Sequence, residues 1–276
     1  MKIMVTGHKG YIGNCLFSFL LNNGYDVHGI DLKDGDDILY CLPDGKYDYV
    51  FHMAAYPKVE YSMISPTHSL RQNVLVTSKV LEWSKNSGVR RVIFSSSAAV
   101  NKGKPKSPYG LHKMMSEMEC KLYSEIYGLD TVSLRYFNVY SKKQPYAGSY
   151  STVVSSWIEM LRKGRSLRID GDGTQTRDFI HLEDIISANI FCMDQESNFN
   201  GKIFDVGSGN STSLNDIRGC IEEYHNVEWC TSPSRKGDIK HSKANITELK
   251  ELGWYPKVDI KVGLKSCFHR NLRKFI

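Results

Sequence analysis

The spacing of three glycines near the N-terminus constrains this chain more than any other feature. Gly7, Gly10 and Gly13 follow a short apolar segment, residues 2–6, and precede an amphipathic stretch at residues 11–21. Such a turn lets the backbone approach a pyrophosphate closely and directs the free N–H groups of a helix N-terminus at the phosphates. Because the glycines stand between an expected strand and an expected helix, they predict a dinucleotide-binding site.

Asp31 predicts which dinucleotide is bound. It ends a second strand-like segment, residues 26–31, and stands eighteen residues after Gly13. A carboxylate at this place accepts hydrogen bonds from a ribose 2′-hydroxyl and repels a 2′-phosphate, so NAD is favoured over NADP. Lys33, two residues further on, is a feature that opposes this prediction.

The first half of the chain alternates strand-like and helical patterns. The strand-like segments are residues 2–6, 26–31, 49–53, 91–95 and 131–135, and the helical patterns are residues 11–21, 66–84 and 108–126. This alternation predicts an α/β fold, a Rossmann-type doubly wound parallel sheet with helices on both faces. The rhythm changes after residue 140, which indicates a second, smaller substrate-binding lobe. We expect residues 1–140 and 178–206 in the NAD-binding domain, and residues 141–177 and 207–276 in the substrate domain.

Composition excludes several classes of function. No apolar run approaches the roughly 18 residues of a membrane span, and the chain passes directly into its glycine motif without a signal peptide. We therefore expect a cytoplasmic protein that does not bind membranes. The seven cysteines and nine histidines form no ligand-spaced cluster, which predicts no metal site. The net charge of +6 comes from scattered basic residues without a nucleic-acid motif, so we expect no nucleic-acid partner.

Two further patterns point to the chemistry. Tyr109 and Lys113 stand four residues apart on an expected helix, so they share one face. A neighbouring ammonium group lowers the pKa of a phenol from about 10 by about 1–3 units, which creates a base near neutral pH. Upstream, an expected strand runs into a serine-rich end, Ser95 to Ser97, where a hydroxyl can hold a substrate oxygen. The ordinary alternatives are a surface Tyr–Lys pair and serines that bond to their own backbone.

Seven segments then occur in an order that carries a resemblance: TGHKGYIG, HMAA, SSSAAV, YGLHK, LRYFNVY, GDGTQTRDFIH and RKGD. The chain resembles the extended short-chain dehydrogenase/reductase family. Within its NAD-dependent epimerase/dehydratase group, the chain is most similar to the UDP-hexose and UDP-N-acetylhexosamine 4-epimerases. The resemblance covers nearly the whole chain.

The resemblance implies a set of functional residues. Those implied as catalytic are Ser97, Tyr109 and Lys113. Those implied to bind or support NAD are Gly7, Gly10, Tyr11, Ile12, Gly13, Asp31, Asp37, Ile38, Met53, Ala54, Ala55, Asn73, Ser95, Tyr109, Lys113 and Tyr136. Those implied to bind the substrate are Ser97, Asn138, Arg177, Arg235, Asp238 and Ser242, the last as a small wall of the sugar pocket that admits a 2-N-acetyl group. A homodimer through residues 66–84 and 108–126 is implied as well.

The predicted function is NAD-dependent 4-epimerisation of a nucleotide sugar, UDP-GlcNAc/UDP-GalNAc or UDP-Glc/UDP-Gal, through a transient 4-keto intermediate. Ala98 and Ala99 stand where the family's dehydratases carry acids, which disfavours dehydration. Three departures from the family pattern keep alternatives open: only eleven residues separate Ser97 from Tyr109, a helix after Asp31 is deleted, and Ser141 replaces a glycine. The alternatives are another NAD(P)-dependent nucleotide-sugar oxidoreductase or dehydratase, and a non-catalytic NAD or sugar-nucleotide binding protein.

Overall fold

The computed structural model describes residues 1–145, 152–234 and 240–272, which form two compact units. The first, here called the sheet unit, comprises Met1–Tyr136 and Ile186–Asp205; the second unit comprises Phe137–Ile185 and Val206–Ile276. The chain thus passes between the units at residues 136/137, 185/186 and 205/206, whereas the sequence suggested 140/141, 177/178 and 206/207. Among the described residues, no helix combines the length and apolar character of a membrane span.

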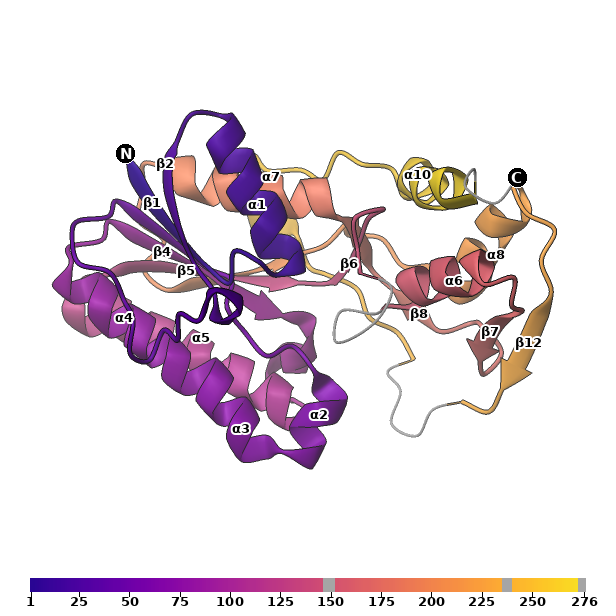
Figure 1. The fold of residues 1–276 in the computed structure, drawn as a ribbon, viewed down its shortest axis with the longest axis horizontal. Helices are drawn as coiled ribbons and strands as arrows, with labels where there is room; N and C mark the ends of the chain where they lie inside the picture. The colour runs from indigo at the N-terminus through magenta and orange to yellow at the C-terminus, as the bar shows by residue number, and fades with distance from the viewer. Residues whose placement is uncertain (146–151, 235–239, 273–276) are drawn as a thin grey trace. The chain divides into compact units, whose positions relative to one another are not determined.

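A six-stranded sheet forms the centre of the sheet unit (Figure 1). Its order is β10-β5-β4-β3-β1-β2. The strands are β1 (Lys2–Thr6), β2 (Asp26–Ile30), β3 (Tyr49–His52), β4 (Arg91–Ser97), β5 (Asp130–Tyr136) and β10 (Lys202–Val206). The pairs β1–β2, β1–β3, β3–β4 and β4–β5 are parallel. Because β2 and β3 lie on opposite sides of β1, the direction of winding reverses there, and ligands of doubly wound sheets bind at such a switch point.

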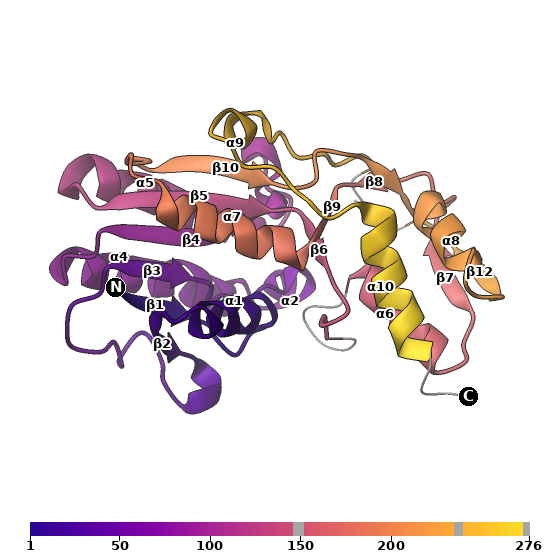
Figure 2. The same ribbon diagram turned by 90° about the horizontal axis from the view of Figure 1, so that it is seen from above.

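Helices cover both faces of this sheet. Helices α4 (Val76–Asn86) and α5 (Pro108–Tyr127) lie on one face, and α1 (Tyr11–Asn22) lies on the other with the part of α7 (Leu182–Asp194) that begins at Ile186 (Figures 1 and 2). Strands buried from both sides read as continuous apolar runs, as in the fully buried Val92, Ile93 and Phe94 of β4. The predicted sheet with helices on both faces is therefore confirmed.

The connections differ from the expected pattern in two places. Residues 66–84 were expected as one helix, but α3 (Pro66–Leu70) joins α4 through a π-helical turn, Arg71–Leu75. A further helix, α2 (Val59–Ile64), precedes them. Between β2 and β3 the structure has only the short 3₁₀ helix η1 (Leu32–Asp34), so the adenine side of the expected dinucleotide site is short.

The second unit has its own core. Its strands pair in twos: β6 (Asn138–Tyr140) with β9 (Phe179–His181), β8 (Thr176–Arg177) with β11 (Thr212–Ser213), and β7 (Leu167–Asp170) with β12 (Trp229–Ser232). Its helices are α6 (Val153–Arg162), α8 (Leu214–Glu222), α9 (Thr247–Glu251) and α10 (Ile260–Leu272). The core includes Trp157, Ile217 and Phe268. The Trp157 indole donates to the Arg168 carbonyl at 2.8 Å, which satisfies its buried N–H group.

Candidate functional site

The glycine turn lies at the switch point of the sheet. Gly7 has φ +70°, and a Cβ atom there would lie 2.7 Å from the Cα atom of Ala54, at the end of β3. A Cβ atom on Gly13 would lie 2.2 Å from the Gly7 carbonyl oxygen. Helix α1 begins at Tyr11 and includes Gly13; its N-cap residue, Gly10, has no side chain to cap it. Its first N–H groups therefore stand at a turn that only glycines can form, as the phosphate-binding prediction requires.

Asp31 lies beside this turn, at the end of β2. Its Oδ2 atom accepts the Lys9 backbone N–H at 2.9 Å, and its Oδ1 atom accepts the Lys33 backbone N–H at 2.9 Å. An ionised carboxylate offers about four acceptor positions, so two hydrogen bonds leave capacity for ribose hydroxyls. The Lys33 ammonium group donates to the Lys9 carbonyl at 2.9 Å.

The remaining predicted cofactor residues differ in exposure. Ile12, Asp37, Met53, Ala54 and Ala55 are partly exposed, whereas Tyr11, Ile38, Asn73, Ser95 and Tyr136 are buried. Ile38 packs in the core of the sheet unit. Asn73 accepts the Tyr56 N–H at 3.0 Å and donates to the Ser69 carbonyl at 2.8 Å, so its amide is used to hold the loop after β3. The Tyr136 hydroxyl donates to the Asn189 side chain at 3.0 Å.

A buried hydrogen-bond chain that the sequence patterns did not indicate runs beneath the turn. His52 Nδ1 lies 2.7 Å from Thr6 Oγ1, and His52 Nε2 lies 3.0 Å from Thr77 Oγ1. Since the Thr77 hydroxyl donates its one proton to the Asn73 carbonyl at 2.6 Å, His52 Nε2 carries a proton and Nδ1 accepts from Thr6. Burial and, to a smaller extent, the charge of Lys113 together lower the pKa of His52 to about 3, so the ring is neutral. These hydrogen bonds hold Thr6 and His52 in place. The two residues end β1 and β3, so they directly precede the two loops at the switch point.

Lys113 is buried behind the end of β4. Its Nζ atom donates to the Ser95 carbonyl at 2.6 Å and lies 4.6 Å from the centroid of the Phe94 ring. Burial lowers the pKa of Lys113 to about 7, while Glu117 acts in the opposite direction. Four residues earlier on α5, the side chain of Tyr109 is 7% exposed, and its backbone N–H donates to the Ser62 hydroxyl at 3.1 Å. Both members of the predicted pair are therefore buried, which excludes the alternative of a surface Tyr–Lys pair.

The short loop between Ser97 and Tyr109 closes directly onto α5. The Ser97 hydroxyl accepts the Ala99 N–H at 3.2 Å, and Asn101, Lys102 and Gly103 all have positive φ. A Cβ atom on Gly110 would lie 2.3 Å from the Ala99 carbonyl oxygen. This close contact places the segment after Ser97 against the first turn of α5, which carries Tyr109. The loop thus brings the two elements with the predicted serine and tyrosine together despite its length.

The predicted substrate residues other than Ser97 belong to the second unit. The Asn138 side chain donates to the Asp178 carbonyl at 2.9 Å, and an Arg177 guanidinium N–H donates to the Thr176 carbonyl at 2.8 Å. The Ser242 N–H also donates to the Thr176 carbonyl, at 3.1 Å, so Ser242 lies beside the strand that carries Arg177. Arg235 and Asp238 lie outside the described residues.

The family of the chain follows from comparison with known proteins. The model of the NAD dependent epimerase/dehydratase family matches residues 3–207. The chain belongs to this family. The match begins in β1 and includes every cofactor residue predicted from the sequence.

Several proteins that this epimerase/dehydratase chain matches along nearly their whole length carry the names of nucleotide-sugar enzymes. It is 29% identical to the UDP-glucose 4-epimerase of Mycolicibacterium smegmatis, over 98% of this chain and 99% of that protein. Among solved structures, it is similar to a UDP-N-acetylglucosamine 4-epimerase from Methanobrevibacter ruminantium in complex with UDP-N-acetylmuramic acid, with TM-score 0.90 and 29% identity over 99% of both chains. It is also similar to a UDP-glucuronic acid 4-epimerase from Bacillus cereus in complex with UDP-glucuronic acid and NAD, with TM-score 0.87 and 27% identity over 100% of both chains.

Asp178 is a structural centre of the second unit in this family member. Its buried carboxylate accepts four hydrogen bonds, from the Ser208 N–H at 2.7 Å, the Ser208 hydroxyl at 2.8 Å, the Gly209 N–H at 3.0 Å and the Ala244 N–H at 3.1 Å. Burial raises the pKa of Asp178, and these donors oppose that shift. The sequence patterns did not single it out, because its hydrogen-bond donors lie 30 to 66 residues away in the chain.

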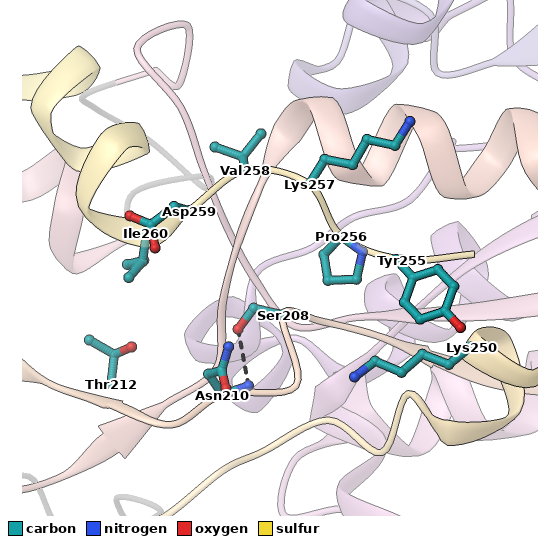
Figure 3. A pocket seen from close by; sticks show the side chains of 10 residues that line it. All are labelled: Ser208, Asn210, Thr212, Lys250, Tyr255, Pro256, Lys257, Val258, Asp259 and Ile260. Carbon is teal, nitrogen blue, oxygen red and sulfur yellow. Dashed lines mark hydrogen bonds between the residues drawn. The ribbon is translucent and has the colours of Figure 1, made fainter. Parts of the chain in front are cut away.

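The second unit of this epimerase/dehydratase chain also has a pocket of about 330 Å³ away from the predicted residues (Figure 3). It lies between the loop after β10 and the segment that leads into α10. Its lining consists of Ser208, Asn210, Thr212, Lys250, Tyr255, Pro256, Lys257, Val258, Asp259 and Ile260. None of the substrate residues implied by the resemblance lines it, so the pocket does not support those assignments.

Proposed function

We propose that the protein is an NAD-dependent 4-epimerase that acts on a nucleotide sugar, with UDP-sugars favoured. The observation that carries this proposal is the buried Tyr109–Lys113 pair on α5, with Lys113 bonded to the Ser95 carbonyl at 2.6 Å. The names of the full-length relatives and the UDP-sugars in their structures support it. The glycine turn and the remaining hydrogen-bonding capacity of Asp31 fit a dinucleotide.

The proposed mechanism assigns proton transfer to the residues of α5 and β4. The ammonium group of Lys113 lowers the pKa of the Tyr109 phenol, because an opposite charge favours the ionised form. The phenolate then takes the proton of the sugar 4-hydroxyl, and the Ser97 hydroxyl holds the same oxygen. NAD held at the glycine turn and Asp31 would supply the hydride acceptor and donor for the oxidation and reduction at C4 of the sugar. Tyr109 finally returns its proton to the new hydroxyl.

In the second unit, we propose that Arg177, Arg235 and Asn138 bind the diphosphate of the substrate. Two guanidinium groups and an amide suit a diphosphate dianion, because guanidinium donors form bidentate hydrogen bonds with phosphate oxygens. Asp238 and Ser242 are proposed to support this site and to shape the sugar pocket. An anchor at the diphosphate leaves the sugar ring free to turn between the two hydride transfers.

A non-catalytic NAD or sugar-nucleotide binding protein is the second candidate. The observation that favours it is the eleven-residue loop after Ser97, which turns back through three consecutive positive-φ residues. Dehydration is disfavoured, because Ala98 and Ala99 have no side chain that transfers protons.

Turnover separates these candidates. The purified protein is incubated with UDP-Glc, UDP-GlcNAc, and GDP- and dTDP-sugars without added reductant, and NMR detects the 4-epimer. We expect a UDP-sugar to be converted, and the Tyr109→Phe variant to lose about 10²–10⁴-fold in rate while it still binds NAD. Tyr127→Phe changes an exposed tyrosine on the same helix and is the matched control. Wild-type turnover by Tyr109→Phe contradicts the mechanism, and NAD binding without turnover of any sugar supports the second candidate.

We further propose a homodimer through residues 66–84 and 108–126, the second of which lies in α5. Leu111, Met118, Leu122 and Ile126 are between 42% and 64% exposed and recur at helical spacing along one side of this helix. The substitution Met118→Lys is expected to give a monomer in analytical ultracentrifugation, whereas Val262→Lys, at an equally exposed apolar position of α10, leaves the dimer intact. A monomeric wild type refutes the proposal.

The cytoplasmic location stays a prediction from the sequence.

A further inference from the structure

Four charged residues surround the place where the ribose 2′-position of a bound dinucleotide is expected. Asp31 directly follows β2, and carboxylates at this position of a Rossmann fold bind the ribose 2′-hydroxyl. Two lysines contact it through their backbones, because the N–H groups of Lys9 and Lys33 both donate to its carboxylate. The site therefore combines the anion that selects NAD with two cations of the kind that bind a 2′-phosphate.

The two ammonium groups are held in different ways. The Lys33 ammonium donates to the Lys9 carbonyl at 2.9 Å, a neutral acceptor, so its charge is not balanced by this contact. The Lys9 ammonium instead pairs closely with the Oδ1 atom of Asp34, in η1. The other oxygen of Asp34 lies 3.4 Å from His8 Nε2. Asp34 thus binds two neighbouring residues of the glycine turn from outside the turn.

The balance of charge at this place depends on Asp34. With Lys9, Asp31, Lys33 and Asp34 ionised, the four charges sum to zero; without the charge of Asp34 the sum is +1. The same change releases the Lys9 ammonium, whose side chain is 42% exposed and therefore free to reorient. A 2′-phosphate would then meet the released Lys9 ammonium as well as Lys33 and the single anion Asp31, whereas a 2′-hydroxyl gains little from either cation.

We propose that Asp34 is a specificity-determining residue for the cofactor: as the counter-ion of Lys9 it withholds this lysine from a 2′-phosphate and strengthens the discrimination that Asp31 begins. The proposal rests on the dinucleotide site of the proposed function. It also accounts for the presence of Lys9 and Lys33 beside an NAD-type carboxylate, since the first is neutralised and the second is used to fasten the glycine turn.

Binding titrations of NAD and NADP test the proposal without any measurement of turnover. Asp34→Asn keeps the size and polarity of the side chain and removes its charge. We expect NADP affinity to rise about 5–20-fold, which is the effect of one additional cation, the released Lys9 ammonium, at a partly exposed site. We expect NAD affinity to change less than about 2-fold. The gain is expected to shrink at high salt, because exposed charges are screened.

Two matched variants make the result specific. Asp36→Asn removes an equal charge from an exposed position in the same loop, and it is expected to leave the ratio of NADP to NAD affinity within about 2-fold of wild type. Adding Lys9→Met to Asp34→Asn is expected to abolish the gain, because the released ammonium is then absent. Melting temperatures of all variants are measured alongside.

The outcomes distinguish this proposal from the function on which it rests. If wild type binds neither dinucleotide, the proposed dinucleotide site itself fails. If wild type binds NAD but Asp34→Asn leaves the NADP to NAD ratio unchanged, only the role of Asp34 is overturned. An equal gain in Asp36→Asn, or a gain that survives Lys9→Met, likewise overturns it, because either result shows a general effect of charge.

Discussion

The Lys113 ammonium group donates to the Ser95 backbone carbonyl at 2.6 Å and so fastens the second turn of α5 to β4. Ser95 in turn donates from its hydroxyl to the His52 carbonyl at 3.0 Å, which extends the connection to β3. The cation is placed by main-chain groups of a buried sheet rather than by a flexible partner. Its position relative to Tyr109 is therefore defined before any substrate arrives, which favours a role in catalysis.

The first prediction concerns pH and the stability of the dinucleotide-free protein. Burial lowers the pKa of Lys113 from 10.5 to about 7, so between these pH values the unfolded chain binds a proton that the folded protein lacks. The free energy of unfolding then rises with pH, by at most about 1.4 kcal/mol per pH unit for this group. Urea denaturation of wild type and Lys113→Met from pH 7 to pH 10 is expected to show this slope in wild type alone. Parallel curves would show that Lys113 keeps its proton in both states.

The second prediction compares two glycines inside helices. Gly110→Ala places a Cβ atom 2.3 Å from the Ala99 carbonyl oxygen, so the segment after Ser97 must move away from α5. We expect turnover to fall at least about 10²-fold, because small displacements of catalytic groups are costly. Gly219→Ala in α8 meets no atom within 4 Å, and we expect it to stabilise the protein by about 0.5–1 kcal/mol without loss of activity. Equal activity of both variants in a steady-state assay would show that the contact at Ala99 does not position Ser97.

The third prediction concerns Asp178. Asp178→Ala leaves three backbone N–H groups without their acceptor: the buried one of Ala244 and the partly buried ones of Ser208 and Gly209. We expect the free energy of unfolding to fall by about 3 kcal/mol or more, with faster amide exchange at these three residues. Asp172→Ala removes an exposed carboxylate from the same region and is expected to lower the free energy of unfolding far less than Asp178→Ala does. A comparable loss in both variants would mean that the buried carboxylate has no special role.

The features that the sequence predicted well are those set by local pattern. The glycine turn, the helix that starts after it and the alternation of strands and helices each depend on neighbouring residues, so periodicity and spacing reveal them. That Tyr109 and Lys113 share one helix face follows from helical geometry once the helix is expected, whereas their burial does not. The deletion after Asp31 was also visible, because it removes residues that a helix would need.

The features that the sequence did not reveal depend on partners distant in the chain. His52 meets Thr6 and Thr77, which are 46 and 25 residues away, and a lone histidine after an apolar strand predicts neither contact. Asp178 meets Ala244 across 66 residues. The π-helical turn between α3 and α4 is likewise invisible, because the apolar residues on either side still fit a single helical period.

The last prediction concerns which sugar is accepted. The resemblance to the 4-epimerases implies that Ser242 forms a wall of the sugar pocket, where a small residue leaves space for a 2-N-acetyl group. In the structure the Ser242 N–H bonds to the Thr176 carbonyl, next to Arg177, and its side chain is half-buried. We therefore expect Ser242→Tyr to lower the interconversion of UDP-GlcNAc and UDP-GalNAc at least about 10-fold relative to that of UDP-Glc and UDP-Gal, by steric exclusion. NMR assays with both pairs measure the ratio, with Ser242→Ala and the exposed neighbour Lys243→Tyr as controls that leave it unchanged. If Ser242→Tyr also leaves the ratio unchanged, the wall that selects the sugar is formed by other residues.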